Sequence, residues 1–155
     1  MCSRFIIFFI LFFPCINIYT FPFLDNKDGT ITDKANNLIW QKCSTNHTSI
    51  LECTGTTTKI SWSNSLIYCK NLTLSNKSWR LPNVNELYTL VDQVKKTSPL
   101  IDTLYFPNTQ SDSYWTSTTS IYLRSRSFAI SYKIGEQLYL SKSTGTAYVR
   151  CVSGP

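Results

Sequence analysis

Residues 78–87, "SWRLPNVNEL", contain the signals that predict where a central helix begins. Pro82 ends the preceding segment, and the side chain of Asn83 can accept a hydrogen bond from a free N–H at a helix start. Glu86, three residues later, completes a capping box. Four apolar residues then follow with helical spacing: Leu87, Leu90, Val91 and Val94. We therefore expect a helix over residues 84–95 with one face buried against a core.

A second helix is expected earlier in the chain, over residues 61–72, "SWSNSLIYCKNL". Ser61 is a suitable N-cap for it. Trp62, Leu66 and Cys69 follow at i, i+4 and i+7 and so share one face of this helix. That face directs Cys69 toward the core.

The remaining apolar segments are short, alternate with polar residues and predict strands. A turn signal, "DGT" at residues 28–30, precedes the first of these, and a calcium-loop interpretation fails because Leu24 and Ala35 occupy two ligand positions. Residues 96–113 contain Pro99 and Pro107 and predict a long loop. The expected strands cover residues 30–33, 38–43, 114–119, 127–133, 136–141 and 147–152. Two helices and a mainly antiparallel sheet make this an α+β fold.

The N-terminal residues predict export. The chain has 155 residues, and Arg4 precedes nine unbroken apolar residues at 5–13. This pattern is typical of a signal peptide, here residues 1–20, followed by one domain at residues 21–155. A run of nine is too short to span a bilayer. We expect a protein that is secreted or held at the cell envelope, with a lipid anchor through Cys15 as the less favoured alternative.

Four cysteines would remain after cleavage, which favours two disulfides in an exported chain. Nine residues separate Cys43 from Cys53 and suit a local clip, which leaves Cys69 to pair with Cys151. Free thiols are the alternative. A zinc site is disfavoured because the spacings lack a paired C-x-x-C and the only histidine is His47. We expect no metal and no other cofactor.

Seven short motifs occur in order along residues 22–153: "DGTITD", "LIWQKC", W-x6-C at 62–69, "WRLPNVNEL", "YFPNT", "YWTST" and "VRCV". Together they resemble the Lcl C-terminal domain family of bacterial exported domains. The resemblance implies a C-type-lectin-like fold, distantly related to formylglycine-generating enzymes, with the same two disulfides. It also implies that Trp79, Arg80 and Leu81 join the core to a loop layer, where the Arg80 guanidinium would satisfy several loop carbonyls.

The chain departs from the active members of that wider superfamily. The oxygen-dependent enzymes have a cysteine five residues before an "RC" element, but here Thr146 precedes Arg150 and Cys151. Calcium-dependent lectins have Glu-Pro-Asn and Trp-Asn-Asp elements, which are replaced here by residues 106–108, "FPN", and 115–117, "WTS". The acidic residues are scattered and no nucleophile has a recognisable base. We therefore expect neither an enzyme nor a calcium site.

Basic residues near the C-terminal strands are the candidate ligand contacts. Arg124 and Arg126 alternate with serine ahead of the expected strand at 127–133, and in a strand they would point the same way. Paired hydrogen bonds from a guanidinium can hold a sulfate or carboxylate group. Lys133 and Lys142 flank the next hairpin.

Aromatic side chains near these cations could offer flat faces to sugar rings. We expect Trp115 and Tyr122 to contribute, with Tyr114 and Tyr139 as further candidates. The competing interpretation is that the aromatic residues pack in the core and the charges are an ordinary solvated surface.

The formal net charge of +6 favours anionic partners. Some proteins of the Lcl family are adhesins whose C-terminal domain binds sulfated glycosaminoglycans. The resemblance thus implies an exported, adhesin-like module that binds anionic glycans or host surface polymers without calcium. The alternative is an envelope module that holds a protein partner. Nucleic acid is disfavoured as a partner by export.

Overall fold

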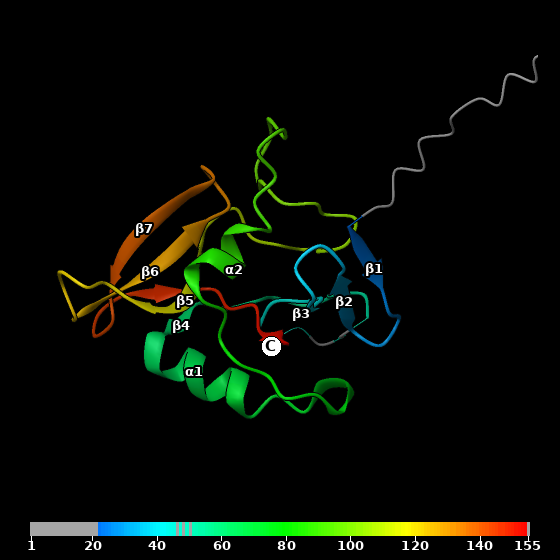
Figure 1. Cartoon of the computed structure of the whole chain (residues 1–155), viewed down its shortest axis with the longest axis horizontal. Helices are drawn as coiled ribbons and strands as arrows, with labels where there is room; N and C mark the ends of the chain where they lie inside the picture. The colour runs from blue at the N-terminus through cyan, green and yellow to red at the C-terminus, as the bar shows by residue number, and fades with distance from the viewer. Residues whose placement is uncertain (1–21, 46, 48, 50, 155) are drawn as a thin grey trace, which may run out of the picture.

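The computed structural model describes residues 22–45, 47, 49 and 51–154. The expected signal peptide and Cys15 lie outside these residues. Antiparallel strands in three sheets and two α-helices confirm the α+β class (Figure 1). No helix within the described ranges has the length and apolar character needed to cross a membrane.

The first sheet contains strands from both ends of the described chain, in the order β1-β2-β3-β9. The strands are β1 (Phe23–Asp25), β2 (Thr30–Asp33), β3 (Leu38–Gln41) and β9 (Val152–Ser153). The predicted turn joins β1 to β2: the Asp28 carboxylate accepts a hydrogen bond from Thr30 N at 3.0 Å, and Gly29 has a φ of 85°. Glycine adopts this conformation without steric cost.

The second and third sheets lie toward the other side of the molecule (Figure 1). The second pairs β4 (Ile60–Ser61) with β8 (Thr146–Ala147), and the third has the order β5-β6-β7. Its strands are β5 (Ser113–Thr119), β6 (Arg126–Ser131) and β7 (Glu136–Ser141). Trp115 packs in a cluster with Leu66 of α1 (Trp62–Lys70), whereas Tyr114 packs with Leu87 of α2 (Val84–Tyr88). Successive strand residues face opposite ways, so the two helices cover opposite faces of this sheet.

Both predicted helix starts are confirmed. Ser61 caps α1 by accepting a hydrogen bond from Asn64 N. The capping box of α2 is complete: Asn83 Oδ1 accepts from Glu86 N at 2.9 Å, and Asn83 N donates to Glu86 Oε2 at 2.8 Å. These reciprocal bonds satisfy two backbone donors that a helix leaves free.

The prediction that the helix capped by Asn83 runs over residues 84–95 was wrong at its end, because α2 ends at Tyr88. The Asp92 carboxylate accepts hydrogen bonds from the N–H groups of Val94 and Lys95, and Asp92 N donates to Leu100 O. A side chain that bonds nearby backbone in this way competes with helix. Three of the four predicted core residues are buried, but Val94 is 81% exposed.

The expected strand at 147–152 is interrupted. Its two ends belong to β8 and β9, Tyr148 forms an isolated bridge with Tyr114 of β5, and residues 149–151 belong to no strand. Val149, Arg150 and Cys151 are all buried, so the in-and-out alternation of a surface strand is lost. Instead Val149 O accepts from Thr45 N and Cys151 O accepts from Gln41 N. This segment is therefore an internal connection between two sheets.

The segment from Trp79 to Pro82 bridges the first and third sheets. Trp79 is buried. Arg80 exchanges two backbone hydrogen bonds of 2.9 Å with Val152 of β9. Pro82 O accepts from Ser117 N of β5 at 2.8 Å. The stretch that precedes α2 thus connects two sheets as well as starting a helix.

Both disulfides form with the predicted pairing, Cys43 with Cys53 and Cys69 with Cys151. The second joins α1 to the buried connection before β9 across a sequence separation of 82, against 10 for the first. The long loop at 96–113 is confirmed, and it packs inward through buried Ile101 and Phe106.

Removing the long-range disulfide should destabilise the domain more than removing the local one. In the chain-entropy model the losses are about 4.5 kcal/mol for Cys69→Ser/Cys151→Ser and about 2.7 kcal/mol for Cys43→Ser/Cys53→Ser. Urea unfolding of both double variants measures the difference. Equal losses, or a greater loss for the local pair, would contradict this ranking.

Acid should destabilise the domain partly through Asp25. Burial raises the pKa of this carboxyl, but hydrogen bonds from Lys27 N and from the Lys42 and Lys27 ammonium groups outweigh burial and lower the pKa to about 2 from 3.8. Its stabilising contribution is therefore present at neutral pH and is lost as the pH falls from about 4 to about 2. The Tm gap between the wild-type protein and Asp25→Asn should shrink over that range, and a constant gap would argue against this role.

Candidate functional site

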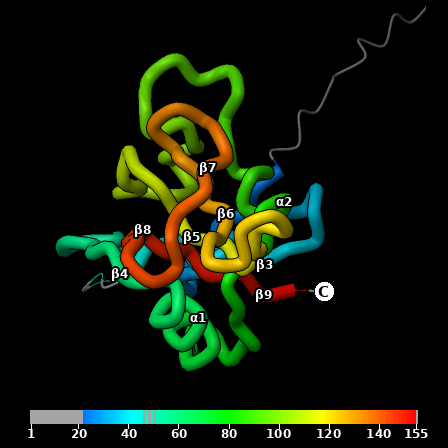
Figure 2. The backbone as a smooth tube through the Cα atoms, turned by 90° about the vertical axis from the view of Figure 1, so that its left-hand side faces the viewer, coloured from blue at the N-terminus to red at the C-terminus, as the bar shows by residue number. Residues whose placement is uncertain are grey.

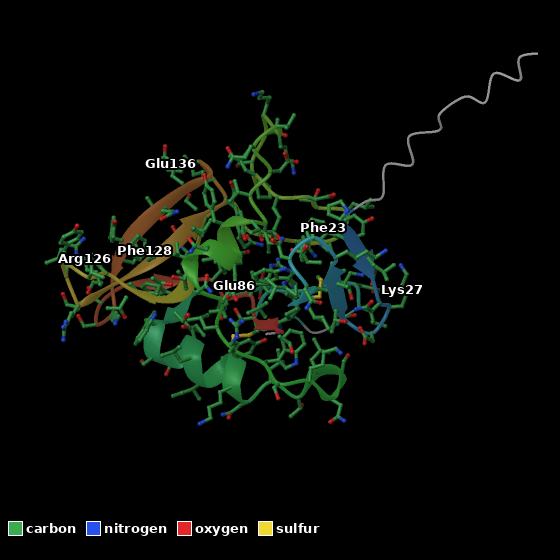
Figure 3. The ribbon with its side chains drawn as sticks, viewed as in Figure 1. Phe23, Lys27, Glu86, Arg126, Phe128 and Glu136 are labelled. Atoms are coloured by element: carbon green, nitrogen blue, oxygen red, sulfur yellow. A yellow bond between two sulfur atoms is a disulfide. The ribbon has the colours of Figure 1, made fainter. Side chains whose placement is uncertain are left out.

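The β6–β7 hairpin divides the predicted ligand residues into two groups. Its register pairs Arg126 with Ser141 at one end and Ser131 with Glu136 at the other. Lys142 follows the first end and Lys133 lies in the turn at the second, roughly 17 Å away at the rise of a strand. Figure 3 shows Arg126 and Glu136 at opposite ends of the hairpin. Lys133 is therefore too far away to share a small ligand with the other cations.

Arg124 and Arg126 are both exposed, but the strand geometry predicted for them was wrong. Arg124 lies in a turn closed by a hydrogen bond from Arg126 N to Leu123 O at 2.8 Å, and β6 begins only at Arg126. The two side chains are therefore not ordered by the i, i+2 alternation of a strand. Arg124 lines a surface hollow with Lys142, and the Arg126 guanidinium donates to Tyr139 O at 3.4 Å.

Trp115 cannot offer a ring face to a ligand. It is 0% exposed, and its Nε1 donates to Ile60 O at 2.9 Å in the core beside α1. Tyr114 is buried as well, whereas Tyr122 and Tyr139 are exposed. The amphipathic pattern of β5 could not show this, because helices cover both of its faces.

Lys142 is held at the surface by the aromatic residue that starts α1. Its Nζ lies 4.0 Å from the centroid of the Trp62 ring and donates to Thr119 Oγ1 at 2.7 Å. A cation over an indole face is attracted by the ring quadrupole. The Trp62 Nε1 in turn donates to Thr116 O at 2.9 Å. Trp62, expected to be structural, thus also positions a candidate ligand contact.

A bulge in β5 shapes the surface beside Lys142. The pairing of β5 with β6 shifts register between Trp115 and Thr119. Ser127 Oγ lies within hydrogen-bond distance of the Thr116 and Thr118 carbonyls, at 2.9 and 2.8 Å. Bulges redirect side chains, often at the rims of sites. This one leaves the end of β5 half-exposed between the two helices.

Two shallow hollows adjoin this end of β5. The first is lined by Thr119, Ser120, Ile121, Arg124 and Lys142. The second is lined by Leu66, Lys70, Trp79, Arg80, Leu81, Asn83 and Ser117. Ser117 and Thr119 are two residues apart in one strand, or about 7 Å. We call the cations of both hollows, together with Arg126, the basic surface: Lys70, Arg80, Arg124, Arg126 and Lys142.

Arg80 lines the second hollow, and unlike the other cations of this surface it forms an ion pair with a described residue, Glu86. Its guanidinium donates to both oxygens of Glu86, each at 2.8 Å, and its side chain is 40% exposed. Burial raises the pKa of Glu86, but the hydrogen bond from Arg80 and that from Asn83 N give a net lowering. A second guanidinium, that of Arg150, donates to backbone carbonyls in the core, including Gln41 O at 2.9 Å.

The rest of the basic surface has little negative charge near it. Residues 53–85 and 113–155 contain Glu136 as their only acid, and Glu136 lies at the far end of the hairpin (Figure 3). Among the described residues, no ion pair involves Lys70, Arg124, Arg126 or Lys142. The charges of these four cations are therefore not neutralised by ion pairs among the described residues.

The loop between β5 and β6 also carries apolar side chains that the sequence analysis did not select. Ile121 and Leu123 are 81% and 53% exposed, and Tyr122 between them is 86% exposed. Figure 2 shows this yellow loop in front when that end of the molecule faces the viewer. The stretch "IYLRSR", with an apolar triplet next to two arginines, was the signal that could have identified it.

Comparison with known proteins identifies the family and nothing more specific. No curated protein matches the chain. The family model described as the Lcl C-terminal domain matches residues 29–153, which include α1, α2 and every strand except β1. Both disulfides and the basic surface fall within the matched range. The chain therefore belongs to the Lcl C-terminal domain family.

Proposed function

We propose that this domain is an exported binding module, and not an enzyme, that recognises a linear anionic polymer through the basic surface. Sulfated glycans are the first candidates, as the family resemblance implies. The observation that carries the proposal is a group of four cations that form no ion pair among the described residues, three of them exposed and Lys142 half-buried: Lys70, Arg124, Arg126 and Lys142.

The spread of these cations favours a polymer over a single small anion. Lys142 contacts Trp62 at the start of α1, and Lys70 lies in its last turn. Eight residues of helix correspond to about 12 Å, which exceeds the size of one sulfate group. Thr119 and Ser117, two residues apart in β5, each line one of the two hollows. An extended chain with repeated anionic groups can contact both hollows at once.

The guanidinium groups of Arg124 and Arg126 suit sulfate or carboxylate chemistry. A planar guanidinium can form paired hydrogen bonds with either group. Such contacts bind the anion directly, so the proposal requires no bridging calcium ion. Two disulfides are consistent with an extracytoplasmic location, where we place this interaction.

Replacing both arginines should weaken binding to heparin. Wild-type protein should stay on immobilised heparin beyond about 0.3 M salt, where attraction between dispersed exposed charges is largely screened. Arg124→Gln/Arg126→Gln should elute at lower salt and bind heparin roughly tenfold or more weakly in solution, because charged hydrogen bonds are lost. Chelator should change neither protein, and loss of wild-type binding on chelation would contradict a calcium-free site.

The matched control removes the same charge elsewhere. Lys34 and Lys96 are exposed and lie in other loops, so Lys34→Gln/Lys96→Gln should elute close to wild type. Lys133→Gln tests the far end of the same hairpin. Equal losses in the arginine and lysine variants would show attraction to net charge alone and would overturn the site. Elution of the arginine variant with wild type would do the same.

A further inference from the structure

The exposed apolar side chains at 121–123 form a cluster at the tip of the β5–β6 loop. Other large apolar side chains with comparable exposure, such as Val94 and Leu104, occur singly along the described chain. Single exposed apolar residues are normal, whereas a contiguous group marks a contact site. Binding of an anionic polymer to the basic surface does not require exposed apolar side chains, so this cluster is left unexplained by the proposed function.

The loop that presents the cluster is built by its own hydrogen bonds. Ser120 N donates to Arg126 O at 3.0 Å, and Arg126 N donates to Leu123 O at 2.8 Å. Leu123 N donates to the buried Ser120 Oγ at 3.2 Å, and Lys142 N donates to Ser125 O at 2.9 Å. The loop is thus fixed to β6 and to the end of β7, with its apolar side chains directed away from the core clusters.

Cations surround the base of this tip. Ile121 lines the same hollow as Arg124 and Lys142, and Arg126 begins the adjoining strand. The tip therefore has apolar and tyrosine side chains at its end and Arg and Lys behind them. This order matches the boundary of a bilayer, where apolar acyl chains lie beneath polar headgroups. Basic residues near such a surface are attracted by anionic headgroups.

We propose that residues 121–123 insert into the interface of a lipid bilayer whose surface carries anionic headgroups. Ile121 and Leu123 enter the acyl boundary, and the Tyr122 hydroxyl stays at headgroup level. Arg124, Arg126 and Lys142 contact the headgroup phosphates. A tip of three exposed side chains suits shallow insertion into lipid better than a protein interface, which needs about 800 Å² on each partner. The cations are shared with the proposed glycan site, whereas the apolar side chains at 121–123 are not part of that site, so their replacement tests the lipid contact separately.

Sedimentation with vesicles tests the proposal on the full chain. Phosphatidylcholine vesicles are prepared with and without phosphatidylglycerol, and no glycan is present. Wild-type protein should bind the anionic vesicles more strongly, and Ile121→Ser/Leu123→Ser should lower that partition about tenfold through lost apolar burial. Val94→Ser/Leu104→Ser removes two exposed apolar side chains elsewhere and should bind like wild type. All variants share one N-terminal segment, so differences between them report the substituted sites.

Insertion depth is a second readout. The indole of Tyr122→Trp should be quenched by lipids with brominated acyl chains beyond the quenching of the wild-type tryptophans, and this result would support insertion. Unchanged quenching would overturn it. Equal vesicle binding by wild type and Ile121→Ser/Leu123→Ser would also overturn it and would leave a protein partner as the occupant of the loop. Equal losses in both double variants would overturn it as well, since the effect would not be specific to the tip.

Discussion

The buried guanidinium of Arg150 is the interaction on which the rest of the structure depends. The side chain is 0% exposed, donates to the carbonyls of Gln41 and Lys42 and to Thr109 Oγ1, and lies 4.7 Å from the Phe106 ring centroid. Burial lowers its pKa, and the hydrogen bonds of its two terminal nitrogens offset part of the cost of burying the charge, while the buried Nε has no partner among the described residues. The end of β3 and the long loop at 96–113 are therefore held in place around one group.

The next residue extends this constraint to the surface. Cys151 is bonded to Cys69 of α1, and its N–H donates to Gln41 Oε1 at 3.1 Å. The helix that Cys69 anchors begins at Trp62, whose ring holds the Lys142 ammonium. Core, disulfide, helix and basic surface thus form one continuous path. This path gives the half-buried Lys142 ammonium a fixed position at the surface.

Local signals in the sequence predicted much of the fold and less of the site. The two helix N-termini, at Ser61 and Asn83, depend on neighbouring residues, and both predictions are confirmed. The disulfide pairing had only a few alternatives, and it is confirmed as well. The early end of α2 and the burial of Trp115 depend on contacts between distant segments, which spacing does not reveal. The basic surface combines residues of α1 with the β5–β6 loop, and a bulge in β5 brings them together.

The central claim is that ligands meet this protein at the end formed by the β5–β6 loop and the start of α1. Amide NMR spectra of labelled protein, titrated with a short sulfated oligosaccharide, test it most directly because every backbone N–H reports its own environment. The account predicts the largest shifts at residues 117–126 and 142, with smaller shifts along α1 toward Lys70. Shifts concentrated in β1–β3 or in the loop at 92–112 would contradict it.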